Sequence, residues 1–407
     1  MNILWNRTDT IAIAVSGGID SMVLLDKVRR TGCYNKLYVL HVNHQLRDAS
    51  VEELTMITNY CNEHNIELVV HTIPKGYFDL TKSIQNEARV VRYQFFETVI
   101  HERGINYLLT AHHLDDQTET ILFRLLTNRY HYQPIDILSV DYRDSYKIVR
   151  PLLDESKSDL IDYAKVHNVP FMTDESNLEN KYLRNFIRNN VFTVLEQSSL
   201  NKYNLLHLAD YMRDADALVM ERVSIFNTAI ESNVVSRVAL TRENRLVAER
   251  VIVLLIQKYA HVYSVSHKLI EEIIRVLQSD ATHASFEVTP GWHIQIAYDK
   301  LIVRNKNEKI DEYIEVTLPG KYYFNDYVID VKYVFEPITI RTRKDGDVIE
   351  INGGHQKISR IMKDFKVPIY ERSKIPLVCV GKQVIAVGNY KYNHHPFNKD
   401  IIITKEN

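Results

Sequence analysis

The length and the charge of the chain limit what it can be. At 407 residues it is too long for one ordinary hydrophobic core, so we expect two or three domains. A net charge of −2 and a sequence pI near 6.8 exclude a uniformly basic nucleic-acid binder, although they allow local basic surfaces.

The cysteines and the apolar runs exclude further classes. Cys33, Cys61 and Cys379 lie far apart, and the absence of a Cys-x-x-Cys pair argues against a zinc ribbon, a redox pair or a cluster site. No run approaches the roughly 20 apolar residues that a membrane span needs. We therefore expect a protein of the reducing cytoplasm with no membrane partner.

The first part of the chain alternates between strand and helix patterns. β-branched apolar runs predict strands at Thr10–Val15, Leu37–Val42, Leu68–Thr72 and Tyr107–Thr110, and helical periodicity predicts helices at about Asp20–Arg30, Ser50–His64, Ser83–Arg103 and Asp115–Leu126. A further extended run, "YKIVRPLL", precedes a helix at Ser156–His167. This alternation predicts an α/β fold with a parallel sheet, helices on both of its faces, and ligands at the carboxyl ends of its strands.

The rest of the chain has a different pattern. From about Asn201 to Asp280 the strand signal fades and amphipathic helices predominate. After Ser285 short alternating runs return, which predicts a small α+β domain at the end of the chain. We predict an α/β domain at 1–198, a mainly helical middle domain at 199–308, and the α+β domain at 309–407.

The stretch Ser16–Ser21, "SGGIDS", lies where the first strand meets the first helix. Gly17 and Gly18 allow backbone conformations closed to other residues, and the helix start offers N–H groups to a phosphate. Asp20 would repel a bare phosphate, so its presence suggests a bridging Mg²⁺. The alternative is a tight turn in which an Asp-Ser pair only caps the helix.

Four other stretches lie near strand ends or on the neighbouring helices. They are "HVNHQLR" at 41–47, "NEARVVRY" at 86–93, "TAHHLDDQTETILFRLL" at 110–126, and "DESNLENKYLRNFIRNNV" at 174–191. Together with Ser16–Ser21, these stretches resemble in order and spacing the motifs of the tRNA(Ile)-lysidine synthetase family. This family is a branch of the ATP pyrophosphatase (PP-loop) superfamily. The resemblance extends through "RPLL" at 150–153 and implies an adenine nucleotide alpha hydrolase-like fold.

The resemblance implies a two-step reaction on RNA. In this family ATP adenylates the C2 oxygen of the wobble cytidine in a CAU anticodon, and the amine of L-lysine then displaces AMP to give lysidine. ATP and Mg²⁺ are therefore the expected cofactors, tRNA(Ile) and lysine the expected substrates, and a homodimer is compatible with the superfamily. Ser16, Gly17, Gly18, Ile19, Asp20 and Ser21 are expected to bind ATP, with Asp20 also holding Mg²⁺.

The acidic segment after the fourth predicted strand is the second part of the expected site. Asp116 and Glu119 lie three apart on one helix face, where paired carboxylates can hold or orient a lysine ammonium. The resemblance points to His112, Asp116 and Glu119 as functional residues. The alternative is ordinary placement of acids at a helix N-terminus. A metal site of His112, His113 and Asp115 is less well supported, because nothing supplies further soft ligands.

The arginines complete the predicted site. The resemblance implies that Arg89 and Arg92 contact ATP or the adenylated intermediate. It places Arg184 at the transferred phosphate and Arg188 on the tRNA, both in "RNFIR". The alternative is that all four arginines are solvated charges on helix surfaces and bind nothing. The segment "TNRYHYQPIDILSVDY" at 127–142 departs from the family because it lacks glycine, and Tyr130, His131 and Tyr132 there could stack on unpaired bases.

The segment 338–388 resembles the C-terminal domain of the longer synthetases. Between Arg341 and Lys374 nine basic residues face five acidic ones, a local excess that suits contact with a tRNA backbone. The residues expected to bind RNA there are Arg341, Arg343, Lys357, Arg360 and Lys363. The alternative is a surface that only keeps the domain soluble.

Other functions are less compatible with the sequence. A tRNA thiolation enzyme of the same superfamily would typically bring cysteine pairs, and an amide-forming ligase would bring a glutaminase part or its own signature. A catalytically inactive RNA-binding protein would have no physical need for the clustered acids Asp20, Asp116 and Glu119.

Overall fold

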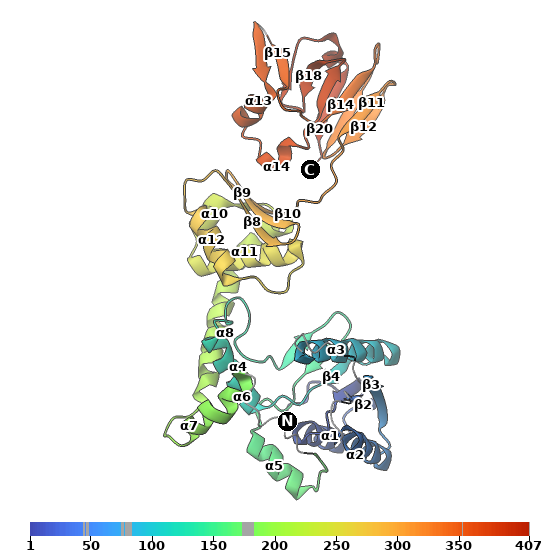
Figure 1. Cartoon of the computed structure of the whole chain (residues 1–407), viewed down its shortest axis with the longest axis vertical. Coiled ribbons are helices and arrows are strands. Elements are labelled where there is room, and N and C mark those ends of the chain that lie inside the picture. The colour runs from blue at the N-terminus through green and yellow to red at the C-terminus, as the bar shows by residue number, and fades with distance from the viewer. Residues whose placement is uncertain are drawn as a thin grey trace. The chain divides into compact units, whose positions relative to one another are not determined.

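The computed structural model describes residues 1–43, 45, 49–74, 77, 84–172, 183–351 and 353–406. Their contacts divide the chain into two compact units, Met1–Asp216 and Ala217–Asn407, which are described separately below (Figure 1). The finer division into three domains stays a prediction.

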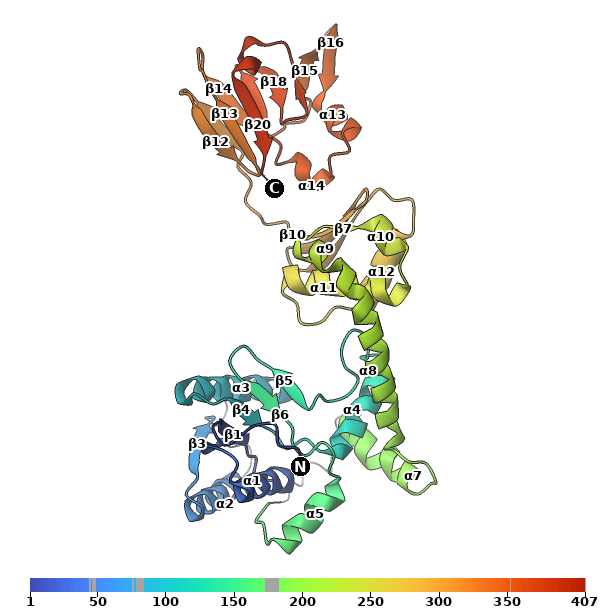
Figure 2. The ribbon, with the colours of Figure 1, turned by 180° about the vertical axis from the view of Figure 1, so that it is seen from behind.

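The first unit is built on a six-stranded sheet. Its strand order is β3-β2-β1-β4-β6-β5, and the strands are β1 (Thr10–Ala14), β2 (Lys36–Asn43), β3 (Glu67–Thr72), β4 (Tyr107–Leu109), β5 (Val140–Tyr142) and β6 (Lys147–Val149). All neighbours are parallel except β5, which pairs antiparallel with β6 at the edge. The parallel sheet is thus confirmed. The antiparallel edge strand was not predicted, and a four-residue connection is sufficient for such a hairpin (Figure 2).

Helices cover both faces of this sheet, as predicted. Alternate residues of β1 point to opposite faces. Ile11 and Ile13 join a core with α1 (Ile19–Thr31), α2 (Ala49–Glu63) and α5 (Lys157–Val166), whereas Ala12 joins a core with α3 (Ile84–Arg103). Figure 1 shows α3 on one side of the strands and α1 and α2 on the other.

A helical group follows at the edge of the first unit. Its members are α4 (Leu114–Leu126), α6 (Leu183–Phe186), the π-helix η2 (Ile187–Phe192), α7 (Thr193–Glu196) and the start of α8 (Asn204–Val223). Ile121 of α4 and Ala209 of α8 pack together with Ile135 in a small buried core. Ile135 belongs to the loop at 127–139, which connects α4 to β5. The loop at 127–139 is therefore anchored between two helices.

The second unit begins with helices and a small sheet. The helices are η3 (Ser224–Phe226), α9 (Asn227–Glu231), α10 (Arg237–Thr241), α11 (Arg245–Ala260) and α12 (His267–Leu277). The strands β7 (Val235–Ser236), β8 (His283–Thr289), β9 (Trp292–Ala297) and β10 (Lys300–Asn305) pair antiparallel in the order β7-β10-β9-β8. The sequence predicted a mainly helical domain at 199–308 and short alternating runs after Ser285, and those runs form β9 and β10. Tight turns at Gly291 and Tyr298, both with positive φ, let the intervening runs pair into a sheet.

The end of the chain is rich in strands, as predicted. One sheet runs β11-β14-β17-β18-β15-β16 with β19 added on β18, and a second runs β12-β13-β20. The strands are β11 (Tyr313–Val316), β12 (Gly320–Phe324), β13 (Tyr327–Val331), β14 (Ile338–Arg341), β15 (Val348–Ile351), β16 (Gly354–Lys357), β17 (Leu377–Val380), β18 (Gln383–Val387), β19 (Lys391–Tyr392) and β20 (Ile401–Lys405). The helices are α13 (Ile358–Asp364), α14 (Ile369–Arg372) and η4 (Pro396–Lys399).

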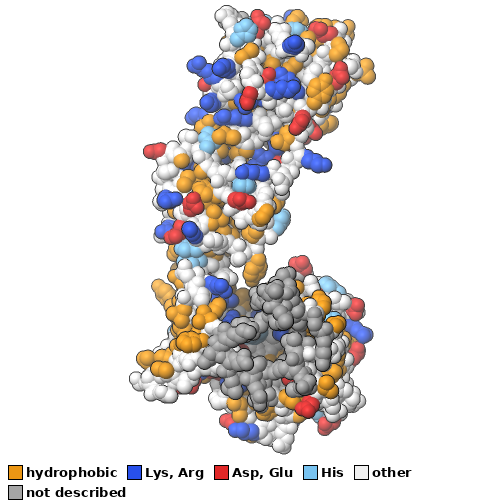
Figure 3. All heavy atoms as spheres, in the orientation of Figure 1, with side chains coloured by type: hydrophobic (Ala, Val, Ile, Leu, Met, Phe, Trp, Pro, Cys, Tyr) orange, Lys and Arg blue, Asp and Glu red, His pale blue; other side chains and the backbone are white. Residues whose placement is uncertain are grey.

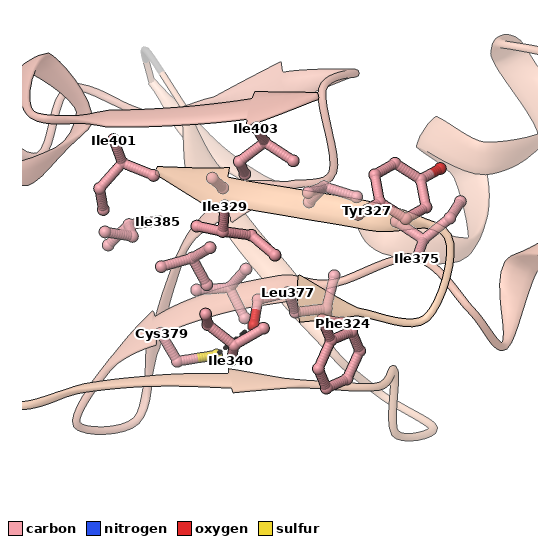
Figure 4. Packing of buried hydrophobic residues seen from close by; sticks show 14 of the residues in the cluster. Phe324, Tyr327, Ile329, Ile340, Ile375, Leu377, Cys379, Ile385, Ile401 and Ile403 are labelled. Carbon is pink, nitrogen blue, oxygen red and sulfur yellow. Dashed lines mark hydrogen bonds between the residues drawn. The ribbon is translucent and has the colours of Figure 1, made fainter. Parts of the chain in front are cut away.

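A continuous apolar core fills this part of the second unit. Figure 4 shows Ile329, Ile340, Leu377 and Ile403 converging from different strands. Cys379 is buried in the same core and, like Cys33 and Cys61, forms no disulfide. None of the helices in the described ranges combines the length and apolar character that crossing a bilayer requires.

Candidate active site

The turn between β1 and α1 has the backbone that the sequence predicted. Gly17 has a φ of +87°, a conformation that favours glycine. A Cβ atom there would meet Glu53 and Ile57 only at 3.6 Å, so the backbone conformation, not crowding, requires glycine at this position. Gly18 has extended backbone angles and caps α1.

Hydrogen bonds within the turn fix its shape. The Ser21 hydroxyl donates to the Gly18 carbonyl oxygen at 2.9 Å and accepts the Ser16 N–H at 3.2 Å. Ser16 is exposed, and α1 begins at Ile19, so the positive end of the helix dipole lies beside an accessible hydroxyl. This arrangement suits a phosphate group.

Asp20 has a partner that the sequence analysis did not identify. Lys157, the first residue of α5, places its Nζ 2.6 Å from Asp20 Oδ1. The backbone N–H of Lys157 donates to Asp115 Oδ2 at 2.7 Å, so the lysine links the turn to the start of α4. No local motif marks Lys157, which is the first residue of an ordinary helix. Only the packing of α5 beside α1 brings it to the turn.

His113, rather than His112, lies among the carboxylates. It is 4% exposed and caps α4. Its Nε2 is 3.5 Å from Asp116 Oδ2 and 3.9 Å from Asp20 Oδ2, and its Nδ1 is 3.7 Å from Asp115 Oδ2. Within the described residues Nδ1 is buried without a hydrogen-bond partner. The double histidine was visible in the sequence, but which ring faces the acids depends on how α4 leaves the sheet.

His112 has a different environment. Its Nδ1 lies 3.0 Å from the Thr110 hydroxyl. Burial lowers the pKa of His112 to about 4, because the rise caused by Asp116 is outweighed by burial and by the positive charges of Arg150 and Arg89. The imidazole is therefore neutral near pH 7.

Glu119 and Arg188 form a charge pair within the site. Arg188 Nε lies 2.5 Å from Glu119 Oε1 and Nη2 lies 2.8 Å from Oε2, which is a bidentate arrangement. Arg188 Nη2 also lies 3.4 Å from Asp116 Oδ1. Burial raises the pKa of Glu119 and Arg188 opposes that rise, while the bond to Glu119 raises the pKa of Arg188. Because both oxygens of Glu119 face the guanidinium, we take the pair to be ionised.

The two arginines of "RNFIR" have contacts that their predicted roles did not include. Arg188, assigned to RNA from the sequence, contacts the two acids. Arg184, assigned to the transferred phosphate, lies with its guanidinium 5.4 Å from the centre of the Phe123 ring. The antiparallel packing of α6 and η2 against α4 sets this order. Both sequence-based roles stay predictions.

Asp115 serves as a structural anchor. Lys202 Nζ lies 2.7 Å from its Oδ1, and the Tyr203 hydroxyl donates to the same oxygen at 3.3 Å. Burial would raise the pKa of Asp115, but Lys202 and the N–H of Lys157 together lower it. The carboxylate thus fastens the residues that precede α8 to the start of α4.

Arg89 and Arg92 are exposed on α3. The Arg89 guanidinium lies 4.9 Å from the centre of the Tyr93 ring, and its charge lowers the pKa of His112. The structure therefore brings Arg89 into the electrostatic neighbourhood of the site.

The distal residues expected to bind RNA fall into two groups. Arg341 is half-buried and holds Asp347 with two bonds of 2.8 and 2.9 Å, and Arg343 pairs with Asp345 at 3.2 Å. Lys357, Arg360 and Lys363 are exposed at and along α13, and no ion pair is found for them among the described residues. Figure 3 shows basic side chains gathered at the edge of the C-terminal part that carries α13.

Parts of two motifs lie outside the described residues. They are His44, Leu46 and Arg47 of "HVNHQLR", and residues 173–182, which include the start of "DESNLENKYLRNFIRNNV". Within the described part of the chain, no group of three or more His, Cys, Asp or Glu side chains could hold a metal ion. Mg²⁺ needs fewer ligands, because one or two carboxylates together with substrate phosphates usually hold it. Asp20 beside the turn fits that requirement.

Comparisons with known proteins identify the family of the chain. A family model for the PP-loop domain matches residues 2–195, and one for the TilS substrate C-terminal domain matches residues 338–400. The tRNA(Ile)-lysidine synthase of Staphylococcus aureus (strain N315) is 36% identical over 98% of this chain and 97% of its own length. That of Staphylococcus epidermidis (strain RP62A) is 36% identical with the same coverage. The bifunctional protein TilS/HprT of Listeria monocytogenes is 28% identical, over 91% of this chain and 63% of that protein.

Proposed function

This chain belongs to the tRNA(Ile)-lysidine synthase family, and from its site geometry we propose how it performs the reaction of that family. It is an ATP-using ligase that forms a carbon–nitrogen bond and produces lysidine on tRNA(Ile). The substrates in the proposed mechanism are ATP, L-lysine and a tRNA(Ile) with a CAU anticodon.

In the first step the cytidine C2 oxygen attacks the α-phosphorus of ATP. The bond from that phosphorus to the bridging oxygen breaks, and pyrophosphate leaves. The turn at Gly17 and the start of α1 bind the departing diphosphate. Asp20 and Lys157 lie beside it, the first as the residue that would hold Mg²⁺ and the second as a cation for the phosphate oxygens. When bound, Mg²⁺ would neutralise charge on the diphosphate.

In the second step a lysine amine attacks C2, the C2–oxygen bond breaks, and AMP leaves. The amine loses a proton to solvent during this step. His112 is neutral near pH 7, but with a pKa of about 4 it is too weak a base to take that proton, so its part is to position substrate groups by hydrogen bonding. Asp116 and Glu119 orient the cationic substrate. Because Arg188 already contacts both carboxylates, the lysine substrate must compete with Arg188 for them. Arg188 then becomes available to the phosphate or to the RNA.

The observation that carries this proposal is the continuous series of polar contacts from the turn to α4. Asp20 contacts His113, His113 contacts Asp116, and Arg188 joins Asp116 to Glu119. A nucleotide at the turn and a lysine at the acids would therefore lie within one site. A cytoplasmic setting is compatible with a tRNA substrate.

The test is incubation of the purified protein with ATP, Mg²⁺, radiolabelled lysine and tRNA(Ile) transcripts. We expect acid-precipitable lysine only with the CAU anticodon and with release of pyrophosphate. Incorporation into a transcript with another wobble base would contradict the proposed substrate. Light scattering of the same preparation tests whether the protein is a homodimer.

A further inference from the structure

Phe123 of α4 lies beside two arginines from different segments. The guanidinium of Arg184 is 5.4 Å from the centre of its ring, and that of Arg129 is 5.5 Å away. Both arginines are exposed and Phe123 is partly exposed. At this distance a guanidinium group is attracted to the face of an aromatic ring. The Phe123 ring and the two guanidinium groups therefore form a set of planar groups at the surface.

The loop that supplies Arg129 adds further rings. Tyr130 and His131 stack with their centres 4.4 Å apart and their planes 29° apart, and Tyr132 follows at 5.7 Å from His131. Tyr130 also packs against the small core between α4 and α8. We call Phe123, Arg129, Tyr130, His131 and Arg184 the aromatic–arginine cluster.

This loop is held in place by defined bonds. Gln117 of α4 exchanges two hydrogen bonds with the backbone of Ile137, at 2.8 and 2.7 Å. Arg124 donates to the carbonyl oxygens of Pro134 and Asp136 at 2.5 and 2.7 Å. The rings are thus presented by an anchored segment, so binding to them needs little ordering of the loop.

The cluster lies next to the proposed catalytic acids. Asp116, Glu119 and Phe123 are separated by three and four residues, so they share one face of α4. At 1.5 Å per residue, Phe123 is about 10 Å along the helix axis from Asp116. That distance is spanned by two or three stacked nucleotides at roughly 3.4 Å each.

We propose that the aromatic–arginine cluster binds, by stacking, the unpaired anticodon-loop bases that flank the modified cytidine. Single-stranded RNA is commonly recognised by aromatic rings and guanidinium planes that stack on splayed-out bases. This inference rests on the proposed function, because it requires the target cytidine to enter the site beside Asp116 and Glu119.

The test uses a CAU anticodon stem-loop RNA and the full-length protein. We expect Phe123→Ala and His131→Ala to weaken its binding about 10- to 100-fold while the affinity for ATP stays unchanged. Phe123→Leu keeps an apolar side chain for packing and removes only the ring, so it covers the case in which the alanine variant does not fold. Tyr142→Ala is the matched control, because Tyr142 is an exposed aromatic residue of the same unit with Lys147 Nζ 5.4 Å from its ring.

A second arm identifies the contact as stacking on a base. An RNA with an abasic nucleotide beside the cytidine should bind the unaltered protein more weakly, by a similar factor. The same RNA should bind the Phe123→Leu variant about as well as the intact RNA does, because the two changes remove the same contact. Wild-type binding by Phe123→Leu and His131→Ala would overturn the proposal. Lysine incorporation into full-length tRNA is measured separately, so failure of the proposed function, seen in the unaltered protein, is distinguishable from failure of the cluster.

Discussion

Glu119 in the first unit is 5% exposed and is held by two nitrogens of Arg188, whereas Lys357 in the second unit is exposed on a surface rich in basic residues. The first arrangement joins a buried carboxylate to a partly exposed guanidinium, so solvent screens the pair less than two fully exposed charges and its strength depends on position. The second leaves charges in water, where they act at longer range and are screened by salt. A single substitution should therefore have a large effect in the first unit and a small one on the basic surface.

Asp20→Asn is expected to have the largest effect. The amide keeps the shape of the side chain but removes the charge that attracts Lys157 and would hold Mg²⁺, so lysine incorporation should fall about 10³-fold or more. Asp162→Asn is the control, because within the described ranges Asp162 forms no more than an exposed ion pair with Lys165. Activity of Asp20→Asn within tenfold of the wild type would contradict the proposed role.

Glu119→Gln should lower incorporation about 10²-fold, because the substitution removes a charge-assisted contact for lysine and leaves Arg188 without its bidentate partner. Steady-state kinetics should show the loss mainly as a higher KM for lysine. The matched control is Glu243→Gln, which removes a bidentate pair with Arg222 in the second unit. Equal losses in the two variants would indicate a general effect on stability instead.

Lys157→Met tests the residue that only the structure revealed. We expect the KM for ATP to rise about tenfold, because one cation near the phosphates is lost, while the KM for lysine changes little. Lys165→Met, on the same helix but exposed, should behave as the wild type. An unchanged KM for ATP would show that Lys157 only positions Asp20.

Arg360→Gln combined with Lys363→Gln should weaken tRNA binding only several-fold at physiological salt. The slope of log affinity against log salt should become shallower by about 2, or about 1 for each lost phosphate contact. Arg341→Gln should leave the slope unchanged and lower the stability of the second unit, since Arg341 is paired with Asp347. A slope that stays the same in the double variant would exclude α13 as an RNA surface.

The smallest effect is expected from His112 and concerns stability. In the folded protein its pKa is lowered to about 4, while in the unfolded chain it is near 6.5. The unfolded state therefore binds more protons between these values, and stability is lost as pH falls through this interval. His112→Asn should lose less stability between pH 7 and pH 5 in urea denaturation. Burial lowers the pKa of His41 in the same direction, and that contribution remains in both proteins. If the stability of the wild type and that of His112→Asn depended on pH in the same way, the lowered pKa of His112 would be contradicted.

Local sequence patterns predicted much of the first unit. The alternation of β1, α1 and β2 followed from periodicity, and Gly17 has the positive φ expected of such a turn. At 235–305 the local pattern indicated the helices and the alternating runs after Ser285, but it did not show that β7 joins those runs in a four-stranded sheet. Pairing between short strands depends on turns and on distant partners, which periodicity does not reveal.

The sequence by itself determined the fold class, the nucleotide turn and the acidic start of α4, because each depends on residues that are close along the chain. Tertiary structure decided which charges meet. Lys157 reaches Asp20 across 137 positions, and Arg188 rather than Arg184 reaches Glu119 across 69. It also paired Arg341 with Asp347 and left Lys357, Arg360 and Lys363 exposed. The pairings of Lys157 and Arg188 depend on how helices pack against one another, and the spacing of residues within one helix does not specify that packing.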